Sequence, residues 1–106
     1  MITKRYNIML ADGPLENDPE IDQDIGEAVR KTAMSLEYRC NILLRLEQDF
    51  GPIYTISVSS SDQRVFKNIG SRLRGIACQL LKLNKDKYTS MKYYSRLLVV
   101  KEANTK

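Results

Sequence analysis

The spacing of the apolar residues changes its period along this chain, and that change limits the fold more than any other feature of the sequence. Apolar and polar residues alternate over residues 3–10 and 53–58, as they do in half-buried strands. Apolar residues instead recur every three or four positions over residues 20–49 and 61–83, which predicts two amphipathic helices. The run MKYYSRLLVVKEA at residues 91–103 predicts a third strand. The predicted order is therefore strand, helix, strand, helix, strand.

Three strands and two helices of these lengths predict an α+β fold, a two-layer sandwich with both helices packed on one face of a small sheet. A chain of 106 residues is long enough to bury one core, so residues 1–106 are predicted to form a single domain. If the first helix makes the usual right-handed crossover between neighbouring strands, the first two strands are parallel. Composition predicts an acidic loop at 11–19, a second loop at 83–90 and a frayed C-terminus at 102–106.

The start and the interior of the second helix leave alternatives open. Ser60 and Gln63 have the spacing of a capping box, which predicts a helix start near Ser61. Gly70 lies within the helical pattern, where glycine costs about 1 kcal/mol relative to alanine, so a kink or a split near it is one alternative. A helix-turn-helix over residues 64–83, with the turn at Gly70, is another.

Charge is divided unequally between the two halves of the chain. Residues 1–50 carry six Lys or Arg and ten Asp or Glu, a net charge of −4, whereas residues 51–106 carry eleven and three, a net charge of +8. The second half therefore attracts polyanions, of which nucleic acids are the most common in a cell. The helical period places several cations of the second helix together, opposite its apolar stripe and without a carboxylate among them. These are Arg64, Lys67, Arg74, Lys82 and Lys85, and Arg72 is a further candidate contact on the same helix.

The third predicted strand carries a second basic surface. Alternation places Lys92, Tyr94 and Arg96 on one side of it, and cations interleaved with a tyrosine can hold phosphates while the ring stacks on a base. Polar residues fall on matching sides of the other two strands, namely Arg5 with Asn7 and Thr55 with Ser57. The helix and sheet surfaces lie on opposite layers of the predicted fold, so a monomer would use one of them as its main contact surface.

The motifs of catalysis and metal binding in this chain are incomplete. Glu20, Asp22 and Asp24 resemble the start of a calcium loop, but Ile25 and Lys31 stand where its glycine and its bidentate glutamate belong. With two cysteines and no histidine, the chain cannot supply the four ligands of an ordinary Cys/His zinc site, or a histidine to activate a serine. We therefore expect no catalytic residues, no metal and no cofactor, and a protein that is not an enzyme.

Targeting and membrane signals are missing from the sequence. No apolar run approaches the ~18 residues of a membrane span, and the start MITKRYNIML is too short and too polar for a secretory signal. These features predict a soluble protein of the cytoplasm, or of another intracellular compartment, that does not bind membranes. Both thiols, Cys40 and Cys78, are expected to be reduced there.

The element order, with its basic second helix, resembles the layout of the Alba chromatin proteins and of the C-terminal domain of a bacterial initiation factor, both of which bind nucleic acids. The resemblance is one of layout, without a motif shared residue by residue, and it implies no binding residue in this chain. The main hypothesis is a non-enzymatic protein that binds DNA or RNA through its phosphates, using the basic helix side and the basic, aromatic strand. The alternative is a protein-interaction, inhibitor or regulatory module that forms a homodimer or docks on an acidic partner protein.

Overall fold

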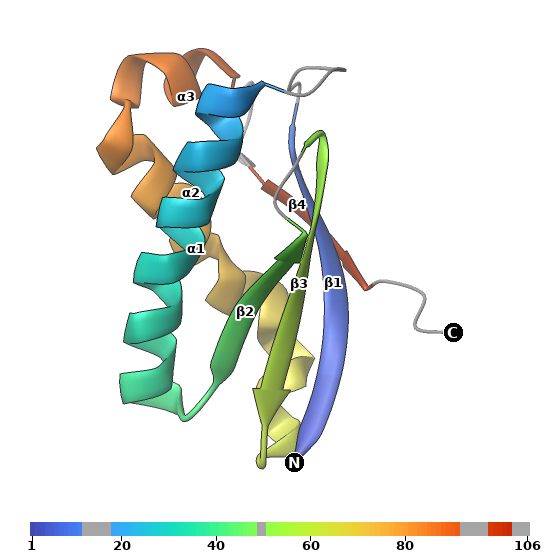
Figure 1. Ribbon diagram of the computed structural model, residues 1–106. Helices are drawn as coiled ribbons and strands as arrows, with labels where there is room; N and C mark the ends of the chain where they lie inside the picture. Colours follow the sequence, from blue (N-terminus) through green and yellow to red (C-terminus); the bar gives the residue numbers. More distant parts are fainter. Residues whose placement is uncertain (12–17, 49–50, 92–97, 103–106) are drawn as a thin grey trace.

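Four strands form one antiparallel sheet within the described part of this protein, and the helices cover one of its faces (Figure 1). The computed structural model describes residues 1–11, 18–48, 51–91 and 98–102. In chain order the elements are β1 (Ile2–Leu10), α1 (Pro19–Cys40), β2 (Leu43–Gln48), β3 (Ile53–Ser60), the 3₁₀ helix η1 (Gln63–Asn68), α2 (Ile69–Leu83), α3 (Lys85–Met91) and β4 (Leu98–Glu102). The predicted α+β fold, with helices packed on one face of a small sheet, is confirmed.

The sheet has the strand order β2-β3-β1-β4, and each neighbouring pair is antiparallel. The chain therefore makes two strand-helix-strand units, β1-α1-β2 and β3-α2-β4, and each unit has a strand of the other inserted between its own two strands. This arrangement is the split βαβ, or ferredoxin-like, topology. It places β1 and β3 at the centre of the described sheet, with β2 and β4 at its edges.

The first helix ends well before its predicted boundary, at Cys40. Asn41 adopts a left-handed conformation (φ 54°, ψ 42°), which asparagine tolerates better than most residues. The N–H of Ile42 then donates to the carbonyl oxygen of Leu36 at 3.3 Å and closes the helix end. The leucines that continue the helical period lie in strand β2, where Leu44 is buried. The chain thus has one more strand than predicted.

The additional strand also changes the strand pairing. The first two predicted strands, β1 and β3, are neighbours, but the prediction that they are parallel is wrong, because the β2-β3 hairpin reverses the chain before β3. The third predicted strand is shorter than expected, since β4 covers Leu98–Glu102. Residues 92–97 of that predicted strand and residues 103–106 of the predicted frayed end lie outside the described residues, whereas Glu102 pairs with Tyr6.

The segment before α2 differs from its prediction in the capping residue. Asp62 caps it in place of Ser60, because Oδ1 of Asp62 accepts a hydrogen bond from the N–H of Arg64 at 3.0 Å, whereas Oγ of Ser60 accepts from the N–H of Asp62 at 3.1 Å. The 3₁₀ helix η1 passes into α2 at Ile69, whose φ of −61° and ψ of −36° are helical. The predicted split lies at Asn68, whose φ of −122° and ψ of 37° are not helical, and this single residue is shorter than the turn of about three to four residues that a helix-turn-helix requires.

The predicted loop at 83–90 contains helix α3 instead. Asn84 begins this helix, because its Oδ1 accepts a hydrogen bond from the N–H of Lys87 at 3.2 Å. Tyr88 is fully buried, and its hydroxyl donates to Oδ2 of Asp24 on α1 at 2.6 Å. One buried tyrosine thus holds a segment of polar composition against α1.

The predicted acidic loop at 11–19 ends where expected. Helix α1 begins at Pro19, and Oδ1 of the preceding residue, Asp18, accepts a hydrogen bond from the N–H of Glu20 at 3.0 Å. Residues 12–17 of this loop lie outside the described residues.

The carboxylates of the run that resembles a calcium loop bind separate partners within the fold. Oδ1 of Asp22 accepts hydrogen bonds from the N–H of Gly51 at 2.8 Å and from the hydroxyl of Tyr54 at 2.6 Å. Glu20 forms an ion pair with Lys87 of α3 at 3.1 Å. Within the described residues, no three His, Cys, Asp or Glu side chains converge as a metal site would need. Two of the acidic residues of the first half, Asp22 and Glu20, therefore connect the start of α1 to β3 and α3.

The core lies between the sheet and the two long helices. Buried side chains of β1 and β3, such as Ile8 and Ile56, pack with those of α1 and α2 in one cluster. The helices approach closely at Gly75, where a Cβ atom would lie 3.2 Å from Cγ2 of Thr32 on α1. This contact explains a glycine inside α2 despite its low helix propensity. None of the described helices combines the length and the apolar content of a membrane span.

Burial, the hydrogen bond to Asp24 and the charge of that carboxylate raise the pKa of Tyr88 well above its ordinary value of 10.0. The unfolded chain releases this proton at a lower pH than the folded protein does. The contribution of Tyr88 to the free energy of unfolding is therefore complete below about pH 10 and is lost as the pH rises above it. Above about pH 10 the free energy of unfolding, measured by urea unfolding, should therefore fall less steeply with pH in Tyr88→Phe than in wild type. Tyr38→Phe, at an exposed position, is the control and should behave like wild type. Equal slopes in wild type and Tyr88→Phe would contradict this assignment.

Candidate nucleic-acid interface

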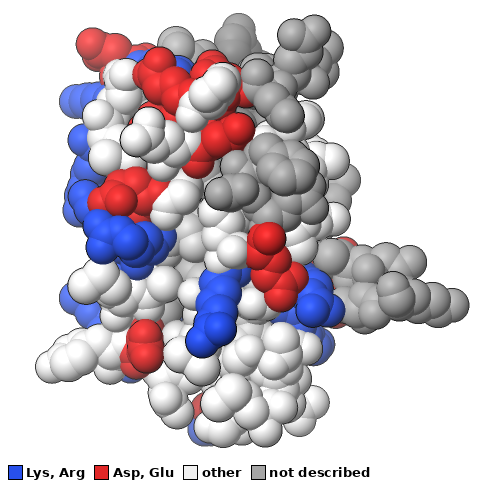
Figure 2. All heavy atoms as spheres, in the orientation of Figure 1, with Lys and Arg blue, Asp and Glu red and all other residues white. Residues whose placement is uncertain are grey.

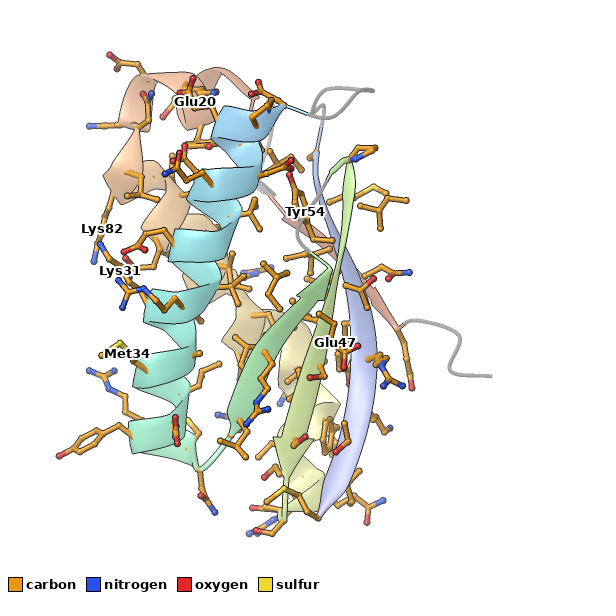
Figure 3. All side chains as sticks on the ribbon, viewed as in Figure 1. Glu20, Lys31, Met34, Glu47, Tyr54 and Lys82 are labelled. Carbon is orange, nitrogen blue, oxygen red and sulfur yellow. The ribbon has the colours of Figure 1, made fainter. Side chains whose placement is uncertain are left out.

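Exposed cations lie along η1, α2 and the start of α3. Leu73, Ile76 and Leu80 are buried on the opposite side of α2. Cys78 is also exposed on the basic side. Figure 3 shows Lys82 at the outer side of the helical layer. We call the following four exposed residues the α2 row: Lys67 of η1, Arg74 and Lys82 of α2, and Lys85, the first residue of α3.

The members of the α2 row lack an ion pair among the described residues, as the exposed Arg39 and Arg45 also do, whereas several other surface cations are paired. Elsewhere, Arg5 pairs with Glu47 at 2.7 Å, Arg30 and Lys31 pair with Glu27, and Lys87 pairs with Glu20 at 3.1 Å. No Asp or Glu within the described residues forms an ion pair with a member of the α2 row. The fold therefore neutralises several cations of the surface and leaves this row, with Arg39 and Arg45, available to an external anion.

Arg64 lies beside the α2 row, but it has a carboxylate partner. Its Nε lies 3.1 Å from Oδ1 of Asp62, and its Nη2 lies 3.2 Å from Oδ2 of the same side chain. Hydrogen bonds from the side chain and the backbone of Arg64 lower the pKa of Asp62. The expectation of a basic side without a carboxylate is corrected by this pair, because Asp62 precedes the helix and falls outside its period. Arg64 therefore offers less net charge to a phosphate than the α2 row does.

Arg72 points away from the α2 row, toward the end of α1. Its side chain is half-buried, and Nη1 lies 3.2 Å from Sγ of Cys40, the last residue of α1. The guanidinium thus lies near the negative end of the α1 dipole. Nε of Arg72 is buried and has no hydrogen-bond partner in the described part of the chain. This placement favours a structural role for Arg72 over a phosphate contact.

The open face of the sheet is polar, as predicted, and several of its groups bond to one another, whereas Arg45 of β2 is exposed and has no ion pair among the described residues. Arg5 and Asn7 of β1 lie opposite Ser57 and Thr55 of β3. Oγ1 of Thr55 donates to Oδ1 of Asn7 at 3.1 Å, and Arg5 pairs with Glu47 of β2. No aromatic side chain is found among the described residues of this face. The predicted contacts Lys92, Tyr94 and Arg96 lie outside the described residues and stay predictions.

A hollow opens where η1 meets the first residues of β1. It has a volume of about 430 Å³ and is lined by Lys4, Gln63, Arg64, Phe66 and Lys67. Nζ of Lys4 lies 5.3 Å from the centroid of the Phe66 ring, which is a cation–π distance. The sequence pattern did not reveal this site, because the fold joins residues that are far apart in the chain. The available signal is Lys4 itself, a lysine on the otherwise apolar side of β1.

Charge is also sorted over the surface of the molecule. Figure 2 shows Asp and Glu gathered at the top of the view, and Lys and Arg along its left edge and also, beside other carboxylates, across its middle. Helix α1 adds two exposed apolar or aromatic side chains, Met34 with 62% exposure and Tyr38 with 92%. Figure 3 shows Met34 and Lys31 pointing outward from α1, away from the sheet. The outer side of the helical layer is therefore basic and partly apolar.

Comparison with known proteins bears on the fold. No protein-family model matches the sequence, and no curated protein matches it. Among solved structures, the protein is similar to a C-terminal segment of the alpha subunit of aIF2, a translation initiation factor, from Pyrococcus abyssi. The TM-score is 0.54 and the sequence identity 13%, over 99% of this chain and 51% of that chain. The chain thus spans about half the length of that chain, and at this identity the likeness shows a shared α+β fold.

Proposed function

We propose that this protein is a non-enzymatic nucleic-acid-binding protein whose α2 row contacts backbone phosphates. The observation that carries the proposal is the row itself, exposed cations along η1, α2 and the start of α3 with no carboxylate partner among the described residues. Cations in this state neutralise phosphates and release their counterions, which drives most non-specific binding of nucleic acids. Within α2, Arg74 and Lys82 are eight residues apart, which at ~1.5 Å per residue separates them by about 12 Å along the helix axis.

The same pattern of pairing favours the helix side over the open sheet face. On the sheet, Arg5 is already paired with Glu47, and Asn7 and Thr55 already bond to each other. A phosphate at these residues would have to replace their contacts, whereas on the α2 row it replaces solvent. Arg45 of β2 is an exposed cation of the sheet face without an ion pair in the described part of the chain. The likeness in fold to a segment of a translation initiation factor supports RNA as the nucleic acid, and DNA is the alternative outcome of the test.

The dependence of binding on salt tests this proposal. Fluorescence anisotropy would measure labelled duplex and single-stranded oligonucleotides from about 50 to 300 mM salt. If the row engages four phosphates, log affinity should fall with log salt at a slope of about −3.6 for duplex DNA and about −2.8 for single strands. A labelled poly-glutamate peptide controls for negative charge alone. A flat salt response, or no binding at the lowest salt, would sink the proposal.

A second candidate function, docking on another protein or self-association, is favoured by the exposure of Met34 and Tyr38. The two side chains lie one helical turn apart on α1, and they would lose apolar surface to water on docking. The acidic start of α1 in one copy could also face the α2 row of another. Light scattering separates these modes, because an electrostatic dimer dissociates as salt rises and an apolar one persists. Poly-glutamate that binds as tightly as an oligonucleotide would favour an acidic protein partner.

A further inference from the structure

The hollow between β1 and η1 holds a combination of groups that phosphate contacts along the α2 row do not require. Its volume of about 430 Å³ is in the range of small-ligand sites. Phe66 supplies a half-buried aromatic ring, and Gln63 supplies an exposed amide with both donors and an acceptor. Lys4 and Lys67 supply ammonium groups without an ion-pair partner in the described part of the chain. An aromatic ring can stack on a nucleotide base, an amide can hydrogen-bond to the edge of that base, and two ammonium groups can bind its phosphate.

The hollow is continuous with the α2 row. Lys67 belongs to both, and η1, which carries Gln63 and Phe66, runs directly into α2. A nucleic-acid strand whose phosphates follow the α2 row toward Lys67 therefore reaches the hollow at the end of the row. Arg64 also lines the hollow, and its guanidinium is hydrogen-bonded to Asp62 at 3.1 and 3.2 Å.

We propose that the hollow takes one unpaired nucleotide of a single strand, with its base on the Phe66 ring and its phosphate between Lys4 and Lys67. This assignment rests on the proposed function, because it requires the strand to lie along the α2 row. Lys4 lies over the ring in the unliganded protein, and its flexible stem lets the ammonium group move to the phosphate as the base takes its place. A base inside a duplex is stacked and paired, so it enters the hollow only by leaving the helix. The hollow therefore favours single strands over duplexes.

The variant Phe66→Leu tests the site when its binding to single strands is compared with its binding to duplexes. We expect its affinity for a single-stranded oligonucleotide to fall about five- to fiftyfold, as for the loss of one base–aromatic stack, and its duplex affinity to stay within about twofold. Retained duplex binding also shows that the variant is folded. Gln63→Ala, at an exposed position, should lower single-strand affinity about two- to fivefold, by an amount that depends on the base. Tyr38→Leu removes an exposed aromatic side chain outside the hollow and should change neither affinity.

A second measurement keeps the assignment testable without any variant. In NMR titrations of the wild-type protein, adenosine monophosphate should shift the signals of the Phe66 ring and the Gln63 amide, and inorganic phosphate should leave both nearly unchanged.

Equal shifts from the two ligands, or equal losses of affinity for single strands and duplexes in Phe66→Leu, would overturn the assignment. If wild type binds oligonucleotides and Phe66→Leu binds single strands as well as wild type does, the hollow assignment fails alone. If the wild-type protein binds neither single-stranded nor duplex oligonucleotides, both the proposed function and the assignment of the hollow fail.

Discussion

Replacing the four cations of the α2 row with alanine is expected to weaken duplex binding by about a thousandfold near 0.1 M salt. Each phosphate contact contributes about 0.9 to the salt exponent, so the salt slope should flatten by about 3.6 at the same time. All four side chains are exposed and alanine favours helices, so the free energy of unfolding should change by less than about 1 kcal/mol. The variant combines Lys67→Ala, Arg74→Ala, Lys82→Ala and Lys85→Ala.

A second variant of equal charge separates the α2 row from the effect of net charge. It also removes four positive charges, but each of them is ion-paired in the fold. Its affinity is expected to fall at most about tenfold, because it changes only the long-range field, which salt screens. Anisotropy titrations of both variants at several salt concentrations measure the difference, and circular dichroism checks that each is folded. Equal losses would show that net charge determines binding and that the row has no special part in it. The control combines Arg5→Ala, Arg30→Ala, Lys31→Ala and Lys87→Ala.

Periodicity in the sequence was sufficient for the elements that bury one side and expose the other. Strands β1 and β3 and the bodies of α1 and α2 are of this kind. Strand β2 was missed because Leu43 and Leu44 continue the helical period of α1, and the left-handed conformation of Asn41 that ends the helix is a property of the fold. Helix α3 was missed because one residue, Tyr88, anchors it, and the hydroxyl partner of Tyr88, Asp24, lies in a distant part of the chain.

For the candidate site, the same periodicity placed Arg74 and Lys82 on the exposed side of α2, since the sides of a helix follow from residue spacing. It did not reveal the break at Asn84, after which Lys85 belongs to α3. It could not show which cations are already partnered. Asp62, the partner of Arg64, precedes the helix, and the direction of Arg72 depends on how α1 packs against α2. The contact between Lys4 and Phe66 depends on β1 lying beside η1. Tertiary contacts therefore decide which cations remain available to a ligand.

The exposure of the α2 row depends on which side of α2 packs against the sheet, and a substitution of Leu73 tests this packing. Leu73 is fully buried and belongs to the cluster of apolar residues between the helices and the sheet. Leu73→Ala removes buried methyl groups and leaves a cavity that the surrounding core fills only in part. The free energy of unfolding is therefore expected to fall by about 3 kcal/mol. Urea unfolding followed by circular dichroism measures the loss.

The matched control makes the same change in the same helix at a position that water reaches. Leu83 is 38% exposed, so Leu83→Ala should lower the free energy of unfolding by less than about 1 kcal/mol. Under conditions in which Leu73→Ala stays folded, its nucleic-acid affinity should remain within about twofold of wild type, because no cation of the α2 row has changed. If Leu73→Ala and Leu83→Ala lowered the free energy of unfolding by the same small amount, Leu73 would not be the residue through which α2 packs on the sheet. The side of the helix that faces solvent, and the α2 row with it, would then have to be reassigned.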